Sequence, residues 1–180
     1  MGFRRVGESE VFRGSHISLA RGTFEAPDGS TFERDLVHHP GAVAVVPVIE
    51  EGAAVLLVRQ YRGVLDRDLL ELPAGLRDIE HEPIEDTARR ELAEEVGMRA
   101  GRLEKLCEFV NSPGFCDEVV HVFVGFDLEP CADDRQGIEE AHMTIERVAL
   151  EDAPAMIRDG RLTDAKTVIG LMLVRDLLAG

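Results

Sequence analysis

The chain has 180 residues, of which 44% are apolar, enough for one domain with a buried core and too many for a disordered chain. Its 35 Asp and Glu residues against 20 Lys and Arg residues leave a formal net charge of −15. Because affinity for nucleic acid and for anionic lipid comes from Lys and Arg that neutralise phosphates, this balance argues against both kinds of partner.

Residues 16–40 are expected to form an antiparallel β-hairpin. Residues 16–25 and 31–38 flank Pro27-Asp28-Gly29-Ser30, a turn in which Pro sets φ and Gly accepts a positive φ. We therefore divide the chain into an N-terminal hairpin segment, residues 1–40, and a larger domain, residues 41–180.

The rest of the chain predicts a mixed sheet with helices. We expect strands at residues 43–49, 53–61, 103–110, 118–128 and 143–148, and helices at 83–96, 152–158 and 164–178. In the first helix, Pro83 fits the first helical position and Gly97 the position after the end. Strands outnumber helices and do not alternate strictly with them, so we expect an α/β (α+β) fold with a mixed sheet and neither a Rossmann nor a TIM arrangement.

Cysteine usage and apolar runs bear on the compartment. The three cysteines, Cys107, Cys116 and Cys131, form no CxxC pair, so we expect reduced thiols and neither a disulfide framework nor a zinc ribbon. The apolar runs fall short of the roughly 20 residues that a membrane span needs, and the N-terminus lacks the apolar core of a secretory signal. We expect a cytoplasmic protein without a membrane partner.

Acidic residues border the apolar side of the helix expected at 83–96. At 100° per residue, Glu95 lies about 40° and Glu91 about 80° from the centre of the apolar stripe, whereas Glu94 points about 140° away. The stripe comprises Ile84, Ala88, Leu92 and Val96.

Two carboxylates one turn apart on such a side repel each other. At an effective dielectric near 20 and a separation of about 4–5 Å, the cost is on the order of 3–4 kcal/mol. A divalent cation offsets it directly, and oxygen-only ligands favour Mg²⁺ or Mn²⁺ over zinc. Counter-charge from Arg89 and Arg90 is the alternative.

Residues 90–98, RELAEEVGM, resemble the second half of the Nudix box, R-E-hydrophobic-x-E-E-x-G-hydrophobic, at every defined position. The first half departs from the family pattern, because six residues instead of five separate Gly75 from Glu82. Glu80 is the alternative, with four residues between it and Gly75. We give the role of the box glutamate to Glu82, with a one-residue loop insertion, because seven residues separate it from Arg90 as in the family pattern.

The resemblance implies a Nudix-type α/β/α sandwich and a metal-dependent hydrolase that cleaves a diphosphate joining a nucleoside to another moiety. It implies that Mg²⁺ or Mn²⁺ is held mainly by Glu91 and Glu95, with Glu94 as an auxiliary ligand and the carbonyl of Ala74 as a further one. Arg90, braced by Glu82, would orient the helix. The catalytic group implied by the resemblance comprises Glu140, Glu139, Glu94 and Arg90.

Outside the box, the chain resembles the ADP-ribose pyrophosphatase subgroup. Pro113 lies 16 residues after Gly97, and similar stretches occur at residues 39–43, 58–62 and 164–170. The implied reaction is ADP-ribose plus water giving AMP and ribose 5-phosphate. Another nucleotide sugar or dinucleotide, such as GDP-mannose or NADH, and a catalytically silent nucleotide-binding module stay open as alternatives.

Five residues are candidates for substrate binding. Arg59 and Arg62 suit phosphate or the terminal ribose, since a guanidinium matches phosphate oxygens bidentately, and surface counter-ions are the alternative. Tyr61 and Phe115 suit stacking on adenine, with plain packing as the alternative. The resemblance adds Pro113.

The general base in this subgroup is usually a glutamate on a loop near the last strand. Here the loop at residues 133–140 precedes the strand expected at 143–148, and the resemblance implies Glu140 as the base, with Glu139 as the substitute. Such a group would deprotonate the attacking water. An ordinary solvated acidic loop is the alternative.

The N-terminal segment also has a counterpart in the subgroup, where a comparable sheet crosses to a second subunit and lines its site. The resemblance therefore implies a homodimer formed through residues 1–40.

Overall fold

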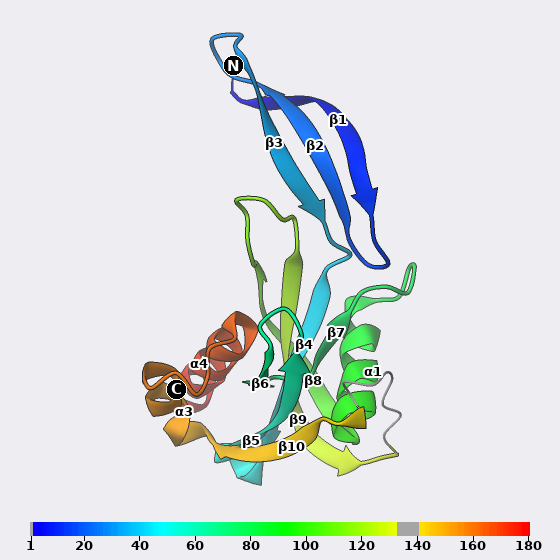
Figure 1. The fold of residues 1–180 in the computed structure, drawn as a ribbon. Helices are drawn as coiled ribbons and strands as arrows, with labels where there is room; N and C mark the ends of the chain where they lie inside the picture. The colour runs from blue at the N-terminus through cyan, green and yellow to red at the C-terminus, as the bar shows by residue number, and fades with distance from the viewer. Residues whose placement is uncertain (1, 133–140) are drawn as a thin grey trace. The chain divides into compact units, whose positions relative to one another are not determined.

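A computed structural model of the chain describes residues 2–132 and 141–180 (Figure 1). The chain forms two compact units. Unit 1 comprises Met1–Gly41 and Phe109–Val119, and unit 2 comprises Ala42–Glu108 and Val120–Gly180. We describe each unit by itself.

Unit 1 contains a three-stranded antiparallel sheet in the order β1-β2-β3. The predicted hairpin is present as β2 (Ser18–Glu25) and β3 (Thr31–His38), and Gly29 in its turn has a φ of 85°. Strand β1 (Arg4–Arg13) is a third strand that the sequence did not predict, and each of its residues is exposed. An apolar/polar alternation arises only when one face of a strand is buried, so β1 offers no such pattern.

Unit 2 is built on a mixed sheet. Within the described residues this sheet has seven strands, five of them in the order β10-β5-β4-β9-β8, with β6 on β5 and β7 on β4. Strand β4 pairs with β9 in parallel and with β5 and β7 antiparallel. The bounds are β4 Ala42–Ile49, β5 Ala54–Arg62, β6 Arg67–Glu71, β7 Ala74–Leu76, β8 Met98–Val110, β9 Val119–Pro130 and β10 Thr144–Ala149.

The helices of unit 2 lie close to their predicted positions. They are α1 (Ile84–Val96), α3 (Ala153–Arg158) and α4 (Ala165–Ala179), with 3₁₀ turns at Glu50–Gly52 and Leu150–Asp152. Gly97 ends α1 in the left-handed conformation with a φ of 67°, as predicted. Pro83 is the residue before the helix and not its first residue, because its ψ of 140° is extended.

Helices cover both faces of β4. Val43 and Val45 pack in one cluster with Ala88 and Leu92 of α1. On the other face, a Cβ added to Gly170 of α4 would lie 3.0 Å from Val46, so that helix approaches the strand closely. Because successive strand residues point to opposite faces, α1 and α4 lie on opposite sides of the sheet (Figure 1). The predicted sheet with helices on both sides is confirmed, and it explains why β4 is almost wholly apolar.

Among the described residues, no helix has the length and apolar content that crossing a membrane requires. Cys107, Cys116 and Cys131 are all free thiols, as expected.

Candidate active site

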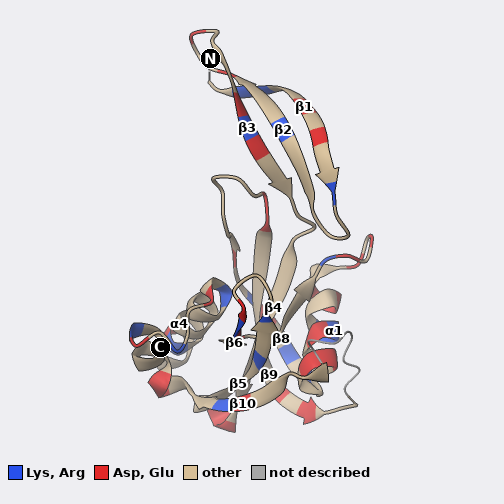
Figure 2. Ribbon diagram, viewed as in Figure 1, with Lys and Arg blue, Asp and Glu red and all other residues tan. Residues whose placement is uncertain are grey.

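Helix α1 buries two of its glutamates. The side of the helix that packs on β4 carries Glu95, 3% exposed, and Glu91, 7% exposed, as the helical wheel predicted. Figure 2 shows the acidic bands of this helix. Glu95 is held in place by strand β7, because the backbone N–H of Ala74 at the start of that strand donates to its Oε2 at 2.9 Å. The metal ligand that the resemblance implied at Ala74 is its carbonyl, and the N–H bond fixes that residue against the helix.

Gly75 makes room for the second carboxylate. A Cβ built on Gly75 would lie 1.9 Å from Cδ of Glu91 and 2.1–2.2 Å from its two oxygens. No side chain fits there without moving the carboxylate. The backbone of residues 74–75 thus meets both buried glutamates of α1.

Arg90 lies among three carboxylates. Its guanidinium contacts Glu91 at 2.7 Å, Glu94 at 3.0 Å and Glu82 at 3.3 Å. Burial would lower the pKa of Arg90, but the hydrogen bond with Glu82 and the neighbouring negative charges raise it above its ordinary value. The six-residue loop brings Glu82 beside Arg90, as the choice of Glu82 over Glu80 requires, with His81 in the left-handed conformation at a φ of 65°.

The carboxylates of α1 suit a hard divalent cation. Across residues 2–132 and 141–180, no three His, Cys, Asp or Glu side chains are already gathered as an ion-binding cluster. Magnesium, however, is bound through one or two carboxylates with several waters and substrate phosphates. Glu91 and Glu95 supply that donor type, and the space that Gly75 leaves for the Glu91 carboxylate is consistent with such a site.

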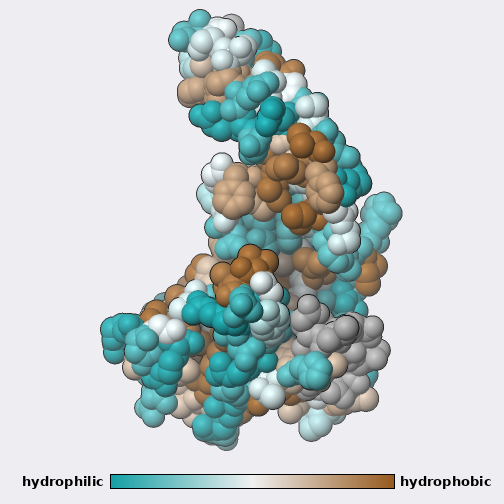
Figure 3. Space-filling model, in the orientation of Figure 1, coloured by the Kyte–Doolittle hydropathy of each residue, from teal (hydrophilic) through white to brown (hydrophobic). Residues whose placement is uncertain are grey.

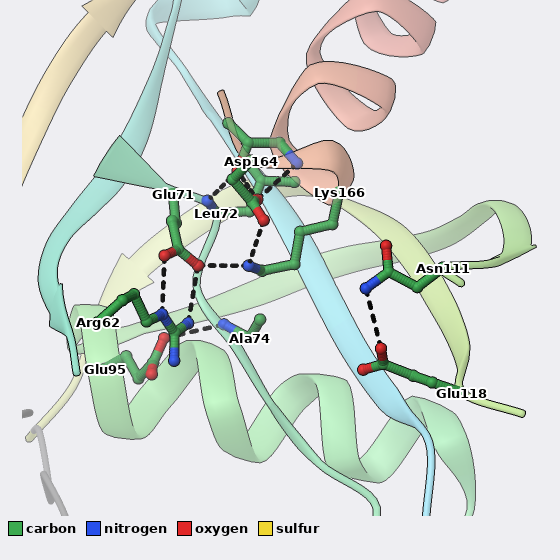
Figure 4. Close-up of polar contacts among 10 residues, drawn as sticks. Arg62, Glu71, Leu72, Ala74, Glu95, Asn111, Glu118, Asp164 and Lys166 are labelled. Atoms are coloured by element: carbon green, nitrogen blue, oxygen red, sulfur yellow. Dashed lines mark hydrogen bonds and ion pairs between the residues drawn. The ribbon is translucent and has the colours of Figure 1, made fainter. Parts of the chain in front are cut away.

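A buried ion cluster lies beside these glutamates (Figure 4). Glu71 is 1% exposed and accepts two hydrogen bonds from Arg62, at 2.8 Å from Nε and 2.7 Å from Nη2. Lys166 donates to the same carboxylate and lies 3.1 Å from Asp164. Burial would raise the pKa of Glu71, but the hydrogen bonds from Arg62 and the charge of Lys166 lower it to about 2. Glu71 is therefore a carboxylate at neutral pH.

Hydrogen bonds tie the 71–75 segment to α4. Asp164 caps that helix by accepting from the N–H of Thr167 at 3.0 Å, and the Thr167 hydroxyl oxygen accepts from the N–H of Leu72 at 2.8 Å. The sequence pointed to Ala74, Gly75 and the stretch 164–170, but not to Glu71 or to Lys166 as members of the site. Their partners lie 9 and 95 residues apart in sequence, and the available signal was a glutamate within an apolar stretch.

The other candidates on β5 are engaged with local partners. Arg59 pairs with Glu146, at 2.5 Å and 3.1 Å, which is the counter-ion arrangement named as the alternative. Tyr61 is 45% exposed, and its hydroxyl donates to Asp66 at 2.9 Å. Of the three predicted residues on this strand, the structure brings Arg62 alone into the buried cluster described above.

Pro113 and Phe115 belong to unit 1. They line a cavity of about 430 Å³ together with His38 and Arg5. Phe115 is 58% exposed, and its carbonyl accepts the N–H of Val37 at 2.7 Å, which fixes the segment to β3.

His38 is clamped between two carboxylates in the same unit. Its Nδ1 lies 2.5 Å from Asp117 and its Nε2 lies 2.9 Å from Glu8 of β1. The hydrogen bond to Asp117, which contributes most, and the hydrogen bond to Glu8 raise the pKa of His38 above its ordinary value. Both ring nitrogens can donate only in the imidazolium form, so the arrangement requires a protonated ring.

The predicted general bases, Glu139 and Glu140, lie outside the described residues. Their assignment therefore stays a prediction.

Comparisons with known proteins agree with this geometry. Residues 38–168 match the sequence profile of the NUDIX domain. The chain is 38% identical to the ADP-ribose pyrophosphatase of Bacillus subtilis (strain 168) over 172 residues, which cover 96% of this chain and 92% of that protein. It is 33% identical to the ADP-ribose pyrophosphatase of Mycobacterium tuberculosis (strain ATCC 25618 / H37Rv), covering 99% and 86%.

Two further likenesses concern a relative with another printed activity and a solved structure. The chain is 30% identical to the GDP-mannose pyrophosphatase of Yersinia enterocolitica serotype O:8 / biotype 1B (strain NCTC 13174 / 8081), covering 89% of each protein. A crystal structure of an ADP compounds hydrolase superposes with a TM-score of 0.87 at 24% identity, covering 100% of this chain and 96% of that one. The last likeness concerns the fold.

Proposed function

We propose that this chain, which belongs to the Nudix hydrolase family, hydrolyses ADP-ribose to AMP and ribose 5-phosphate. The observation that carries the proposal is the buried pair Glu91 and Glu95 against the backbone of residues 74–75, with Arg62 in the neighbouring ion cluster. Similarity to two ADP-ribose pyrophosphatases over nearly the whole chain supports this substrate over others.

In the proposed reaction Glu91 and Glu95 hold Mg²⁺ or Mn²⁺, with Glu94 and the carbonyl of Ala74 as auxiliary ligands. The cation, when bound, neutralises charge on the diphosphate and polarises the phosphorus centre. Arg90 keeps Glu91 and Glu94 in place, since it contacts both directly.

The remaining roles fall to residues around this centre. Arg62 binds a phosphate oxygen of the substrate, because a guanidinium suits such oxygens. Glu140, or Glu139 beside it, accepts the proton of the attacking water as the new P–O bond forms and the bridging P–O bond breaks. Arg59 is proposed for the terminal ribose or phosphate, and Tyr61, Phe115 and Pro113 for the adenine end.

A substrate panel tests this proposal. We expect kcat/KM with Mg²⁺ to be highest for ADP-ribose when ADP-ribose, GDP-mannose and NADH are compared. A preference for GDP-mannose or NADH by more than about tenfold would replace the substrate, since that is 1.4 kcal/mol of selectivity. The GDP-mannose alternative has its own support in the Yersinia relative. Absence of turnover on every diphosphate would favour a silent nucleotide-binding module.

We also propose that the protein is a homodimer formed through the N-terminal sheet. Strand β1 is exposed along its whole length, and an unpaired edge strand invites pairing with another chain. Large apolar side chains are exposed on this sheet and its loops (Figure 3), a feature that often marks an interface. They are Phe3, Val6, Val11, Phe12 and Ile17.

Sedimentation equilibrium at micromolar concentration tests the dimer. A fully active monomer under those conditions would refute it.

The cytoplasmic location expected from the sequence stays a prediction, consistent with three free cysteines.

A further inference from the structure

Glu71 is more deeply buried than either glutamate proposed to bind metal. Glu71 is 1% exposed, and its carboxylate faces two cations, Arg62 from β5 and Lys166 from α4. Ion clusters of this kind contribute little net stability, because desolvation offsets most of the attraction, and apolar residues of similar volume often serve as well. Net stability alone therefore does not account for this buried carboxylate.

Glu71 fixes the orientation of Arg62. The carboxylate accepts hydrogen bonds from Nε and Nη2 of the guanidinium at 2.8 Å and 2.7 Å. This bidentate geometry fixes the orientation of the guanidinium plane. The third nitrogen, Nη1, lies outside this fork. Figure 4 shows the guanidinium beside Glu95 and Ala74, and the charge of Glu95 contributes to raising the pKa of Arg62.

Lys166 supplies a second, independent partner for Glu71. Its side chain is 13% exposed, and its ammonium group bridges Glu71 and Asp164. Glu71 therefore keeps a cation when Arg62 shares its charge with an arriving anion. The segment after Glu71 is held on both sides, by Thr167 at Leu72 and by Glu95 at Ala74.

We propose that Glu71 is a positioning residue that holds Arg62 with its Nη1 directed at the substrate diphosphate, and that Lys166 anchors Glu71 in that place. The proposal rests on the proposed function, because it takes a diphosphate as the ligand of Arg62. Glu71 itself touches no reacting atom.

Three variants test the positioning role: Glu71→Gln, Arg62→Met and the double variant. Loss of a charge-assisted hydrogen bond that orients a binding group weakens binding by about 10- to 100-fold. We therefore expect Glu71→Gln to raise KM for ADP-ribose by about that factor. Its kcat should change by less than about threefold, because binding of substrate and transition state is weakened alike. The double variant should be no worse than Arg62→Met alone, since Glu71 acts through Arg62.

Glu50→Gln is the matched control. Glu50 forms the same two-pronged pair with Arg147, but on the surface, and neither residue belongs to the proposed site. We expect unchanged kcat and KM for this variant.

Other outcomes overturn the proposal. If Glu71→Gln lowers kcat and leaves KM unchanged, the variant has lost folded protein and Glu71 is purely structural. If the effects of Glu71→Gln and Arg62→Met are additive in the double variant, Glu71 does not act through Arg62. If Glu71→Gln does not fold, Lys166→Met is judged by the same KM criterion, with Lys166→Arg expected to restore the wild-type KM.

Failure of the proposed function is visible in the wild type and is therefore distinguishable. If the wild type prefers another diphosphate, the same variant ratios are measured on that substrate. If it cleaves none, calorimetric titration with inorganic pyrophosphate and Mg²⁺ is the readout. Equal affinity of wild type and Glu71→Gln then rejects the positioning role.

Discussion

Both units of this molecule fix a segment by setting an ionised group between two groups of opposite charge, but they do so at very different depths. In unit 2, Glu71 is 1% exposed between Arg62 and Lys166. In unit 1, the side chain of His38 is 33% exposed between Asp117 and Glu8, and that of Asp117 is 53% exposed.

Depth decides what each arrangement contributes. Removing one partner of a buried ion cluster leaves an uncompensated charge and costs about 3–5 kcal/mol. An exposed pair is screened by water and contributes about 0–1 kcal/mol. The buried cluster can therefore hold the 71–75 segment rigidly, whereas the exposed one changes the stability of unit 1 weakly and with pH. The predictions below test this contrast, from the largest expected effect to the smallest.

The first substitution removes a buried charge at the proposed metal site. Glu95→Gln should lower kcat by at least about 100-fold, because a bound metal ion supplies several kcal/mol of charge stabilisation in the transition state. The fold should be kept, since the amide oxygen can still accept from the N–H of Ala74. Steady-state kinetics and circular dichroism measure the two quantities. Unchanged turnover would remove this site from consideration.

The second substitution adds one methyl group beside the other buried glutamate. Gly75→Ala places a Cβ 1.9–2.2 Å from the Glu91 carboxylate, which must move. Because that carboxylate is the end of a flexible side chain, we expect a melting temperature close to wild type and a loss of kcat/KM of about 10- to 100-fold, as for disturbed metal sites. Gly63→Ala, whose Cβ meets Tyr61 at an ordinary 3.7 Å, is the control. Wild-type activity in Gly75→Ala would place Glu91 outside the reaction.

The third concerns stability in acid. The pKa of Glu71 is lowered from 4.5 to about 2 on folding, so its stabilising contribution is complete above pH 4.5 and is lost as pH falls towards 2. Glu71→Gln should therefore lower the free energy of unfolding by about 3 kcal/mol at neutral pH. Urea titrations of both proteins should converge as the pH is lowered through this range. A constant difference would contradict the lowered pKa.

The fourth concerns the exposed clamp. Folding raises the pKa of His38, so its contribution is present below the ordinary value of 6.5 and disappears as pH rises through the raised value. Glu8 and Asp117 face the ring, and Arg5 pairs with Glu8 at 2.5 Å and competes for its charge. His38→Gln should cost no more than about 1 kcal/mol at about pH 5.5 and nothing at about pH 9, by urea unfolding. If His38→Gln lowered the free energy of unfolding more at the higher pH than at the lower pH, folding would not raise the pKa of His38.

Helix α1 and its glutamates could be predicted from sequence because their signals are local. Gly97 marks the end of the helix, and the wheel places Glu91 and Glu95 beside the apolar stripe with no knowledge of the rest of the fold. Strand β1 could not be predicted, because a strand exposed on both faces has no alternation to detect. Strands β6 and β7 are short and fell between stronger signals.

The same distinction separates the parts of the site. Arg62 was a candidate from its neighbours in sequence, but its partner Glu71 and the anchoring Lys166 are brought together only by the packing of β5, β6 and α4. Likewise, the two neighbours of His38 come from β1 and from the 109–119 part of unit 1. Pairings between residues distant in sequence have no pattern that a single chain displays.

The bonds from Lys166 and Thr167 to the 71–75 segment have a consequence for the order of synthesis. A nascent chain that has emerged through β7 already contains Glu71 and Arg62, but the N–H of Leu72 and the second cation of Glu71 become satisfied only after α4 has left the ribosome and docked. A protein truncated before α4 would retain each glutamate proposed to bind metal and still lack the support of the segment they face.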